Sequence, residues 1–449
     1  MDPNSREQSV LGALREALES GTFRDARRMV ATLQPGEIAR LLESLPVAER
    51  RLAWELVDRD SEGEVLVELS DEVRDGLIEG MEIDQLVAAA EGMAVDDLAD
   101  LVADLPEAIN RQVIGALDSV DQERLAEVMA YPEDSAGGLM NTDTISVRAD
   151  VTIDVVTRYL RALKNIPKGT DSLYVVDRDD QYLGELPLTD ILTAEVGSDV
   201  AALMVEDAYS VNVMTPAAEV VRVFEDRDLY SIAVIDDAQQ LLGRITVDDI
   251  VDVIRDEAEH SLMGAAGLDE DHDLFAPVVQ SAQRRAIWLG VNLATAFLAA
   301  AVVDLFQTTI DKVVLLAVLM PIVPSMGGVA GTQSLTIITR ALALGQIEAS
   351  NASAVLRREF SVGLINGAFW AVLVAVVTTL WFGTWTIGLI VAIALACNLL
   401  VAALSGFAIP LLLRKLNVDP ALAGGVILTT ITDVVGYGIF LGLGALILL

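Results

Sequence analysis

Long runs without charged residues in the C-terminal part of the chain constrain its fold most. Residues 286–303, 313–339 and 360–413 contain no Asp, Glu, Lys or Arg, and 420–449 contains only Asp433. A helix needs about 20 apolar residues, at about 1.5 Å each, to cross a bilayer. The run at 360–413 is long enough for two crossings with a turn near Gly383. The sequence therefore predicts five membrane helices, at about 284–306, 313–339, 360–382, 385–413 and 421–448.

Charge divides the chain into two parts. Residues 1–283 hold 61 acidic and 22 basic residues, whereas 284–449 hold six acidic and eight basic ones. An acidic soluble part is therefore joined to an apolar part in the lipid bilayer. Such acidity argues against nucleic acid as a partner, although adaptation to high salt is a simpler explanation of it. The single cysteine, Cys397, excludes a disulfide framework and a Cys-based metal site.

The basic residues at the ends of the predicted spans indicate the orientation. Seven of them fall on the side that carries the soluble part, and only Lys312 falls on the other side. Basic residues collect on the cytoplasmic side of membrane proteins. We therefore expect a multi-pass protein of the cytoplasmic (inner) membrane, with its N-terminal half in the cytoplasm and its C-terminus outside.

Asp433 stands alone in the last apolar run. A charge at the centre of a bilayer costs about 2.5–3.5 kcal/mol on insertion scales, so such residues usually serve an ion path or a partner. Thr429, Gly436 and Tyr437 are spaced to share a helix face with Asp433, which predicts a polar stripe with room for water. The alternative is a protonated Asp433 that is hydrogen-bonded to a neighbouring helix.

The second run contains a stretch rich in proline and glycine, 320–334. Its prolines, glycines and polar side chains are Pro321, Pro324, Ser325, Gly327, Gly328, Gly331, Gln333 and Ser334. We expect a broken backbone whose freed carbonyls face a wet cavity together with Ser325, Gln333 and Ser334. The alternative is a kinked helix whose small residues pack against other helices. A path lined by oxygens with one carboxylate suits a hard divalent cation.

An internal repeat with an offset of 59 residues lies within 140–254. Leu173–Asp177 recurs as Ile232–Asp236, and Gly184 recurs as Gly243. Each copy predicts a helix, an apolar strand, a polar turn, a second strand and another helix, and two such units pair through their sheets. These copies resemble two CBS domains in a tandem pair.

The CBS resemblance implies an adenine-nucleotide site. In that family a stretch from Gly through Thr or Ser to Asp binds the ribose and phosphates. Gly243, Thr246 and Asp249 match it, which implies ATP among the expected ligands. The first copy has Pro187 where the hydroxyl belongs. The alternative is that Asp249 only caps a helix beginning at Ile250.

The fold expected overall is a multidomain membrane protein with an all-α solenoid N domain, an α/β tandem CBS module and a five-helix all-α transmembrane domain. Leu-rich spacing of three and four residues, with a weak 60-residue repeat, predicts the helical N domain. Residues 249–264 predict an amphipathic connecting helix. The expected boundaries are 1–130 for the N domain, 131–202 and 203–254 for the CBS domains, 255–283 for the connecting helix and linker, and 284–449 for the transmembrane domain.

This domain order, with several local motifs, resembles the MgtE family of magnesium channels and transporters. The motifs are Tyr131–Met140 before the CBS pair, Pro324–Gly328 in the second span, Asp419-Pro-Ala before the fifth and Thr432–Gly436 within it. The resemblance implies a homodimer that takes up Mg²⁺ through a pore between the fifth helices, with Asp433 at the ion site. It also implies that Mg²⁺ bound to the cytoplasmic domains closes the pore through the connecting helix.

The predicted site residues form three sets, with the nucleotide set given above. The pore residues are Asp433, Thr429, Gly436, Gly327, Gly328 and Gln333. The regulatory Mg²⁺ residues are Asp96, Asp97, Asp100, Asp248, Asp249, Asp252, Asp256, Glu257, Glu259 and Asp419. His260 and His272 are expected at the surface rather than as metal ligands. The family commonly has Asn at the position of Val329, so the ion selectivity of this chain can differ.

Two other functions remain open at this stage. A proton-coupled or exchanging divalent-cation transporter would use Asp433 to carry a proton or to alternate access. A membrane sensor without transport would use the CBS pair to report on nucleotides and the five helices only as an anchor. We expect no enzyme, because the sequence contains no nucleophile–base pair, phosphate loop or metal-ligand spacing.

Overall fold

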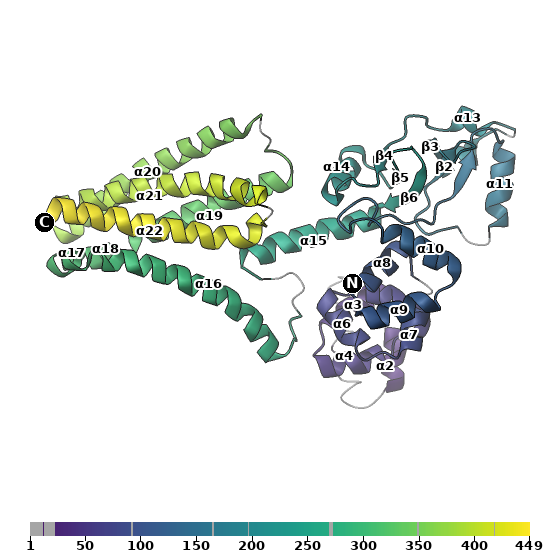
Figure 1. The fold of residues 1–449 in the computed structure, drawn as a ribbon, viewed down its shortest axis with the longest axis horizontal. Coiled ribbons are helices and arrows are strands. Elements are labelled where there is room, and N and C mark those ends of the chain that lie inside the picture. Colours follow the sequence, from purple (N-terminus) through teal and green to yellow (C-terminus); the bar gives the residue numbers. More distant parts are fainter. Residues whose placement is uncertain are drawn as a thin grey trace. The chain divides into compact units, whose positions relative to one another are not determined.

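The computed structural model describes residues 12, 23–90, 93–163, 166–195, 197–268, 273–347, 350–416 and 418–449. The chain forms two compact units. The first comprises Met1–Glu257 with Asp271–Ala276, and the second comprises Ala258–Glu270 with Pro277–Leu449. Figure 1 labels the elements along the chain. Each unit is described by itself below.

The first unit begins with short amphipathic helices. They are α2 (Phe23–Val30), α3 (Pro35–Glu43), α4 (Val47–Trp54), the 3-10 helix η1 (Arg59–Ser61), α5 (Glu62–Val67), α6 (Asp71–Ile78), α7 (Ile83–Ala90), α8 (Val95–Asp104), α9 (Glu107–Ala116) and α10 (Ser119–Val128). Pro46 and Pro106 directly precede α4 and α9, where the fixed φ of proline favours a helix start. Leu42, Leu66 and Leu101 are fully buried between these helices. The expected helical N domain is confirmed.

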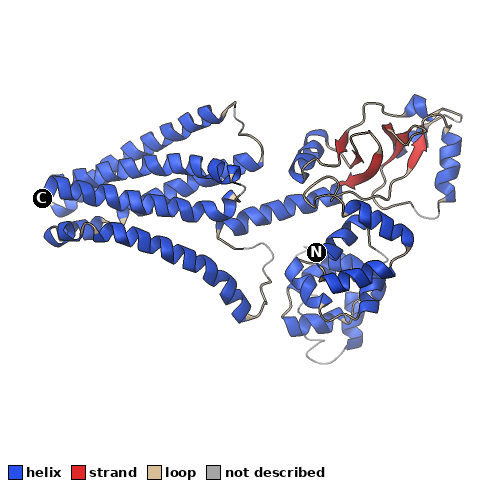
Figure 2. Ribbon diagram, viewed as in Figure 1, coloured by secondary structure: helices blue, strands red, loops and turns tan. Residues whose placement is uncertain are grey.

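Two small sheets follow, one in each copy of the repeat, and Figure 2 shows all the described strands in this region. The first copy contains β1 (Ser146–Arg148), α11 (Ile153–Ala162), β2 (Ser172–Val176), β3 (Tyr182–Pro187), α12 (Leu188–Thr193) and α13 (Val200–Leu203). The second contains β4 (Ser210–Asn212), α14 (Ala217–Arg227), β5 (Ser231–Ile235) and β6 (Leu241–Thr246). In each sheet the first strand pairs parallel and the third antiparallel with the central strand.

The burial of the central strands explains their apolar sequence. Every residue of β2 and of β5 is buried, so both strands are continuous apolar runs rather than alternating ones. The repeat predicted the two longer strands of each copy but not β1 or β4. Those two have three residues each, which is too short for a recognisable alternation.

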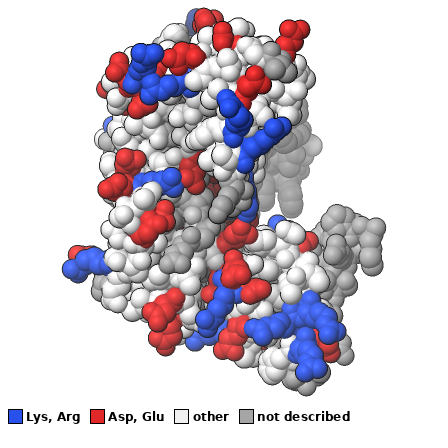
Figure 3. All heavy atoms as spheres, turned by 90° about the vertical axis from the view of Figure 1, so that its right-hand side faces the viewer, with Lys and Arg blue, Asp and Glu red and all other residues white. Residues whose placement is uncertain are grey.

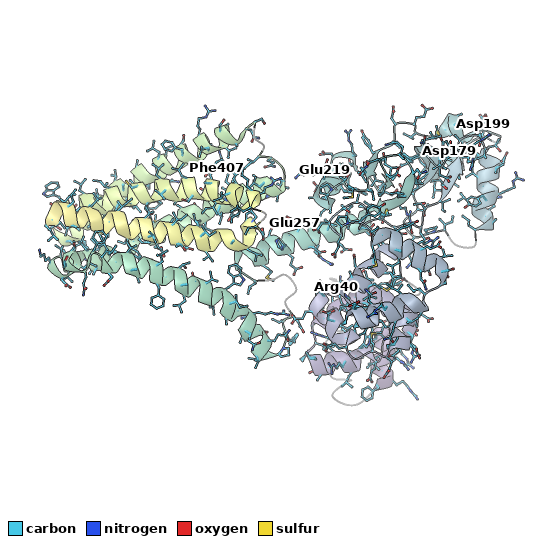
Figure 4. All side chains as sticks on the ribbon, in the orientation of Figure 1. Arg40, Asp179, Asp199, Glu219, Glu257 and Phe407 are labelled. Atoms are coloured by element: carbon cyan, nitrogen blue, oxygen red, sulfur yellow. The ribbon has the colours of Figure 1, made fainter. Side chains whose placement is uncertain are left out.

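Helix α15 (Val247–Ala265) continues directly from β6 and passes from the first unit into the second. It starts two residues before the expected Asp249. Its first turn is acidic, with Asp248 and Asp249, and Glu257 lies further along it (Figure 4).

The second unit contains the apolar helices. They are α16 (Val278–Asp304), α17 (Gln307–Lys312), α18 (Val314–Leu319), α19 (Ile322–Ala343), α20 (Ala352–Phe382), α21 (Trp385–Lys415) and α22 (Pro420–Leu448). In the described chain, five segments are long and apolar enough to cross a membrane, with α18 and α19 forming one of them. The predicted fold class is confirmed. Gly383 ends α20 with a φ of +69°, which makes the turn expected there.

The predicted broken backbone of the second span is wrong in its extent. The helix is interrupted only at Met320 and Pro321, and α19 is regular from Ile322 through Pro324 and the three glycines. Pro324 is the third residue of α19, where an amide N–H has no partner within the helix, so its missing donor breaks no helical hydrogen bond.

Candidate cation sites

Helix α22 presents the predicted pore carboxylate on a partly open side. Asp433 is half-buried, and Thr429, one turn earlier, is exposed with its hydroxyl donating to the Gly425 carbonyl at 2.6 Å. Gly436 is buried and faces Asn398 and Pro324 instead. A helix turns about 100° per residue, so Gly436 lies about 60° around the helix from Asp433. The neighbouring helices cover Gly436, whereas Asp433 is half-buried, and the place of Gly436 in the pore stays a prediction.

Helix α19 packs against α22 and contributes the remaining predicted pore residues. A β-carbon added to Gly328 would lie 3.8 Å from Thr429 Cγ2, so these two positions are neighbours. Gly327 is buried next to Asn398, and Gln333 is exposed further along the helix. The structure thus brings Gly328 and Thr429 together, whereas Gly327 and Gly436 each lie next to the side chain of Asn398.

Ser334 does not face a cavity, contrary to expectation. Its hydroxyl donates to Glu359 Oε2 of α20 at 2.7 Å, and both side chains are buried. Arg358 Nη1 lies 3.2 Å from the other oxygen of Glu359. The predicted span begins at residue 360, directly after Glu359, but α20 begins at Ala352 and includes Arg357, Arg358 and Glu359.

An acidic cluster lies in the first unit between α8 and the start of α15. Burial raises the pKa of Asp96 and of Asp97 on α8, and of Asp249 on α15, to about 7. Repulsion between these carboxylates adds to the effect of burial. Asp97 is repelled by Asp249 and Asp100, and Asp249 is repelled by Asp96.

Asp248 and Asp252 belong to the same cluster. Both repel Asp97, and burial raises the pKa of Asp252 although Arg255 lowers it. Asn141 also reaches the cluster, donating from Nδ2 to Asp96 Oδ1 at 3.2 Å, which the sequence gave no reason to expect.

Three further predicted regulatory carboxylates lie elsewhere on α15. Asp256 is exposed beside Arg255, and Glu257 and Glu259 are exposed further along the helix. Within the described ranges, no three Asp, Glu, His or Cys side chains converge closely enough to hold a metal ion.

Asp419 caps the start of α22. Its side chain accepts from Ala421 N at 2.9 Å and from Leu422 N at 3.2 Å. His260 Nε2 of α15 lies 3.0 Å from Asp419 Oδ2, within the second unit. His260 is thus partly buried and paired with Asp419, whereas a surface position was expected. His272 lies outside the described residues.

The predicted nucleotide residues cluster where β6 meets α15. Asp249 Oδ2 accepts from the Thr246 amide at 2.9 Å and from its hydroxyl at 3.0 Å. Asp249 therefore caps α15 from its third residue, and the helix begins at Val247 rather than at Ile250. A β-carbon on Gly243 would lie 2.9 Å from the Asn141 carbonyl, which explains the glycine by close packing.

Positive charge also lies beside this predicted site. Arg244 is buried and donates to the Lys168 carbonyl at 2.7 Å and to Thr170 Oγ1 at 3.2 Å. Figure 3 shows one face of the molecule, on which acidic and basic side chains are interspersed. The acidic cluster is distinguished from the exposed acidic residues by its burial and by the repulsion between its carboxylates.

An acidic helical domain, a CBS pair and five helices long and apolar enough to span a membrane define a multi-pass membrane protein with a CBS-containing soluble part. Models of the MgtE intracellular N domain, the CBS domain and the divalent cation transporter MgtE match residues 33–134, 136–197 with 198–256, and 320–443. The chain belongs to the MgtE family of magnesium transporters, as the sequence motifs predicted.

Curated relatives extend over nearly the whole chain. The magnesium transporter MgtE of Bacillus subtilis is 30% identical over 95% of this chain and 94% of its own length. The magnesium transporter MgtE of Thermus thermophilus is 30% identical over 98% of this chain and 99% of its own length. A crystal structure of the cytosolic domain of the Mg²⁺ channel MgtE in complex with ATP is 29% identical, with a TM-score of 0.51, and covers 54% of this chain and 99% of its own.

Proposed function

We propose that this protein is a homodimeric channel for Mg²⁺ uptake across the cytoplasmic membrane, with Asp433 of each subunit at the ion site. The accessible carboxylate of Asp433 on α22 carries this proposal. It lies one turn from Thr429, which neighbours Gly328 of α19. A carboxylate that is neither fully buried nor at a helix end is expensive in a bilayer unless it serves a wet path.

The chemistry of Mg²⁺ fits a site with few direct ligands. Mg²⁺ prefers octahedral oxygen and gives up its waters reluctantly. A hydrated ion can be held through water by two carboxylates related by twofold symmetry. Thr429 adds a hydroxyl, and Gly328 leaves space beside it because it has no side chain.

The acidic cluster supports regulation by cytoplasmic Mg²⁺. Ionised Asp97 and Asp249 repel each other where water is largely excluded, so the arrangement is unfavourable without a counter-ion. Divalent cations that bind between such carboxylates favour the compact form over forms in which α8 and α15 separate. In the compact form the connecting helix closes the pore. Asp100, Asp248 and Asp252 extend the same negative field.

An adenine nucleotide at Thr246 and Asp249 would act on the same helix. Both residues lie at the start of α15, next to the acidic cluster, and the similar cytosolic domain was crystallised with ATP. A nucleotide bound there would alter the start of α15, and therefore the Mg²⁺ concentration at which the pore closes.

Purified protein in planar bilayers tests this function. We expect single-channel Mg²⁺ currents that decrease as Mg²⁺ on the side of the soluble domains rises. Stepwise currents would separate a channel from a carrier, because a carrier produces no resolved unitary current. Mg²⁺ flux into liposomes without unitary current would contradict the channel, and absence of both would contradict transport.

A further inference from the structure

We propose that Asn398 is a positioning residue for the ion path and that its side-chain oxygen binds one water molecule inside the helix bundle. The inference rests on the proposed function, because Asn398 joins the two helices that carry the candidate pore residues. Asn398 lies on α21 and is completely buried. A polar side chain at such a place in a membrane domain is expensive and usually has a specific partner.

The amide of Asn398 connects three helices. Its Nδ2 donates to the Val323 carbonyl, in the first turn of α19, at 2.9 Å. A β-carbon on Gly327 of α19 would clash with this nitrogen, and one on Gly436 of α22 would lie 3.0 Å from it. The amide therefore fits only because both neighbouring helices have glycine here. Gly327 and Gly436, both predicted as pore residues, thus leave the space that this side chain occupies.

The orientation of the amide leaves its oxygen without a protein partner. A reversed amide would place two oxygens 2.9 Å apart, so Nδ2 must be the atom that faces the Val323 carbonyl. Oδ1 is then buried with no hydrogen-bond partner in the described part of the chain. The nearby hydroxyl of Thr432 already donates to the Thr429 carbonyl at 3.0 Å. A water molecule is the smallest donor that satisfies such an oxygen, and buried waters commonly serve polar groups in this way.

This junction lies next to the candidate ion path. Gly327 precedes Gly328, the neighbour of Thr429, and Gly436 follows Asp433 by three residues. Because Asn398 contacts both glycines, it fixes the position of α19 along the axis of α22. A slip of one residue would move the helices by about 1.5 Å relative to each other, which is large compared with the tolerance of an ion site.

Single-channel recording of the full-length protein tests the positioning role. Asn398→Leu keeps the branching and the number of side-chain heavy atoms but cannot form a hydrogen bond, and Asn366→Leu changes an exposed Asn of α20 as a matched control. We expect Asn398→Leu to be produced as a dimer in normal yield, with a Mg²⁺ current amplitude about tenfold lower. A residue that only aids packing would change the number of active channels but not their amplitude, and that result would overturn the positioning role.

The controls separate this inference from the proposed function. Wild-type protein without any Mg²⁺ current would refute the channel itself, whereas equal amplitudes in wild type and Asn398→Leu refute only the inference. A structure of the full-length protein that resolves water is expected to show one about 2.7–3.2 Å from Oδ1. A protein donor on that oxygen would overturn the water site.

A second inference comes from independent contacts in the first unit. We infer that a buried ion pair, called the latch below, holds the linker before α16 against the N domain. The linker thereby couples the N domain directly to the first membrane helix. Arg50 of α4 binds Asp273 in bidentate fashion, at 2.8 and 2.9 Å, and the two side chains are 4% and 5% exposed. Arg50 Nε also donates to the Leu42 carbonyl at 3.0 Å, and the Asp273 amide donates to Glu72 Oε2 at 2.7 Å.

A buried, fully hydrogen-bonded pair of this kind gives specificity, because either charge left alone would be costly. It explains why Asp271–Ala276 belong to the first unit although the chain on both sides belongs to the second. Helix α16 begins at Val278, five residues after Asp273, so at most about 18 Å of chain separates them. Movement of the N domain therefore reaches α16 without passing through α15.

Closure of the full-length channel by Mg²⁺ tests this latch. We expect Arg50→Met and Asp273→Asn to keep the current amplitude but to change the Mg²⁺ concentration of half-closure by about fivefold or more. Arg51→Met changes an exposed neighbouring Arg and should behave as wild type. The double variant Arg50→Met with Asp273→Leu removes both buried charges, so it keeps the fold if a single variant does not. Wild-type closure in that double variant would overturn the latch.

Discussion

The acidic cluster makes the stability of the soluble unit depend on pH, and Asp97→Asn tests this dependence. Burial and then repulsion raise the pKa of Asp97 to about 7 in the folded chain, whereas an unfolded chain has a value near 3.9. Between these values the folded chain binds more protons than the unfolded chain, so the free energy of unfolding falls as pH rises. From pH 5 to pH 8 one such carboxyl lowers the free energy of unfolding by about 3 kcal/mol.

Asp97→Asn should remove most of this pH-dependent decrease in the free energy of unfolding. The amide of Asp97→Asn cannot ionise, so its advantage over wild type should grow by about 1–3 kcal/mol between pH 5 and pH 8. The three carboxyls titrate together, so Asp96 or Asp249 can hold the proton that Asp97 would otherwise bind. In that case the gain is near the lower end of this range. The proposed Mg²⁺ binding requires the ionised form, so Mg²⁺ should stabilise wild type at pH 8 more than the variant.

Urea unfolding of a fragment that ends at Ala276, which retains Asp273, measures these differences. Asp84→Asn is the matched control, because it removes the same charge at an exposed position on α7. It should leave the pH dependence as in wild type. Equal pH dependence in wild type and Asp97→Asn, or a wild-type fragment that becomes more stable from pH 5 to pH 8, would refute the reasoning.

Two substitutions test individual residues. Gly327→Ala places a methyl group against Asn398, so we expect thermal stability to fall by about 1–3 kcal/mol together with lower Mg²⁺ flux, whereas Gly425→Ala, which meets nothing within 4 Å, should leave both unchanged. Thr246→Val removes the hydroxyl that contacts Asp249, so calorimetry should show weaker binding of ATP, whereas Thr246→Ser should retain it; equal binding by both variants would contradict the nucleotide site.

The sequence predicted features that depend on local composition. Charge-free runs give the membrane spans directly, and Gly383 marks a turn because few other residues adopt its φ of +69°. The extent of the break in the second span was not predictable by counting prolines. A proline disturbs a helix in its interior but not in its first turn, where Pro324 lies. The start of α19 at Ile322 depends on packing with other helices.

Contacts between distant segments account for what the sequence did not reveal. Asn398 and Glu359 gain their roles from Val323 and Ser334, which lie 75 and 25 residues away along the chain. The charge-free run 360–413 contains two amide side chains, Asn366 and Asn398, and the sequence does not show which of them is buried. The burial of Gly436 was not predictable because spacing defines a helix face only to within about 60°, and the neighbouring helices determine which side is covered.

The most direct test of the ion path is Mg²⁺ flux into proteoliposomes containing wild type, Asp433→Asn or Asp304→Asn. Asp433→Asn retains the shape of the side chain but not its charge, and Asp304 is an exposed carboxylate at the end of α16. We predict flux at the level of empty liposomes for Asp433→Asn, with normal folding and dimer formation, and wild-type flux for Asp304→Asn. Undiminished flux through Asp433→Asn would show that the ion does not depend on this carboxylate.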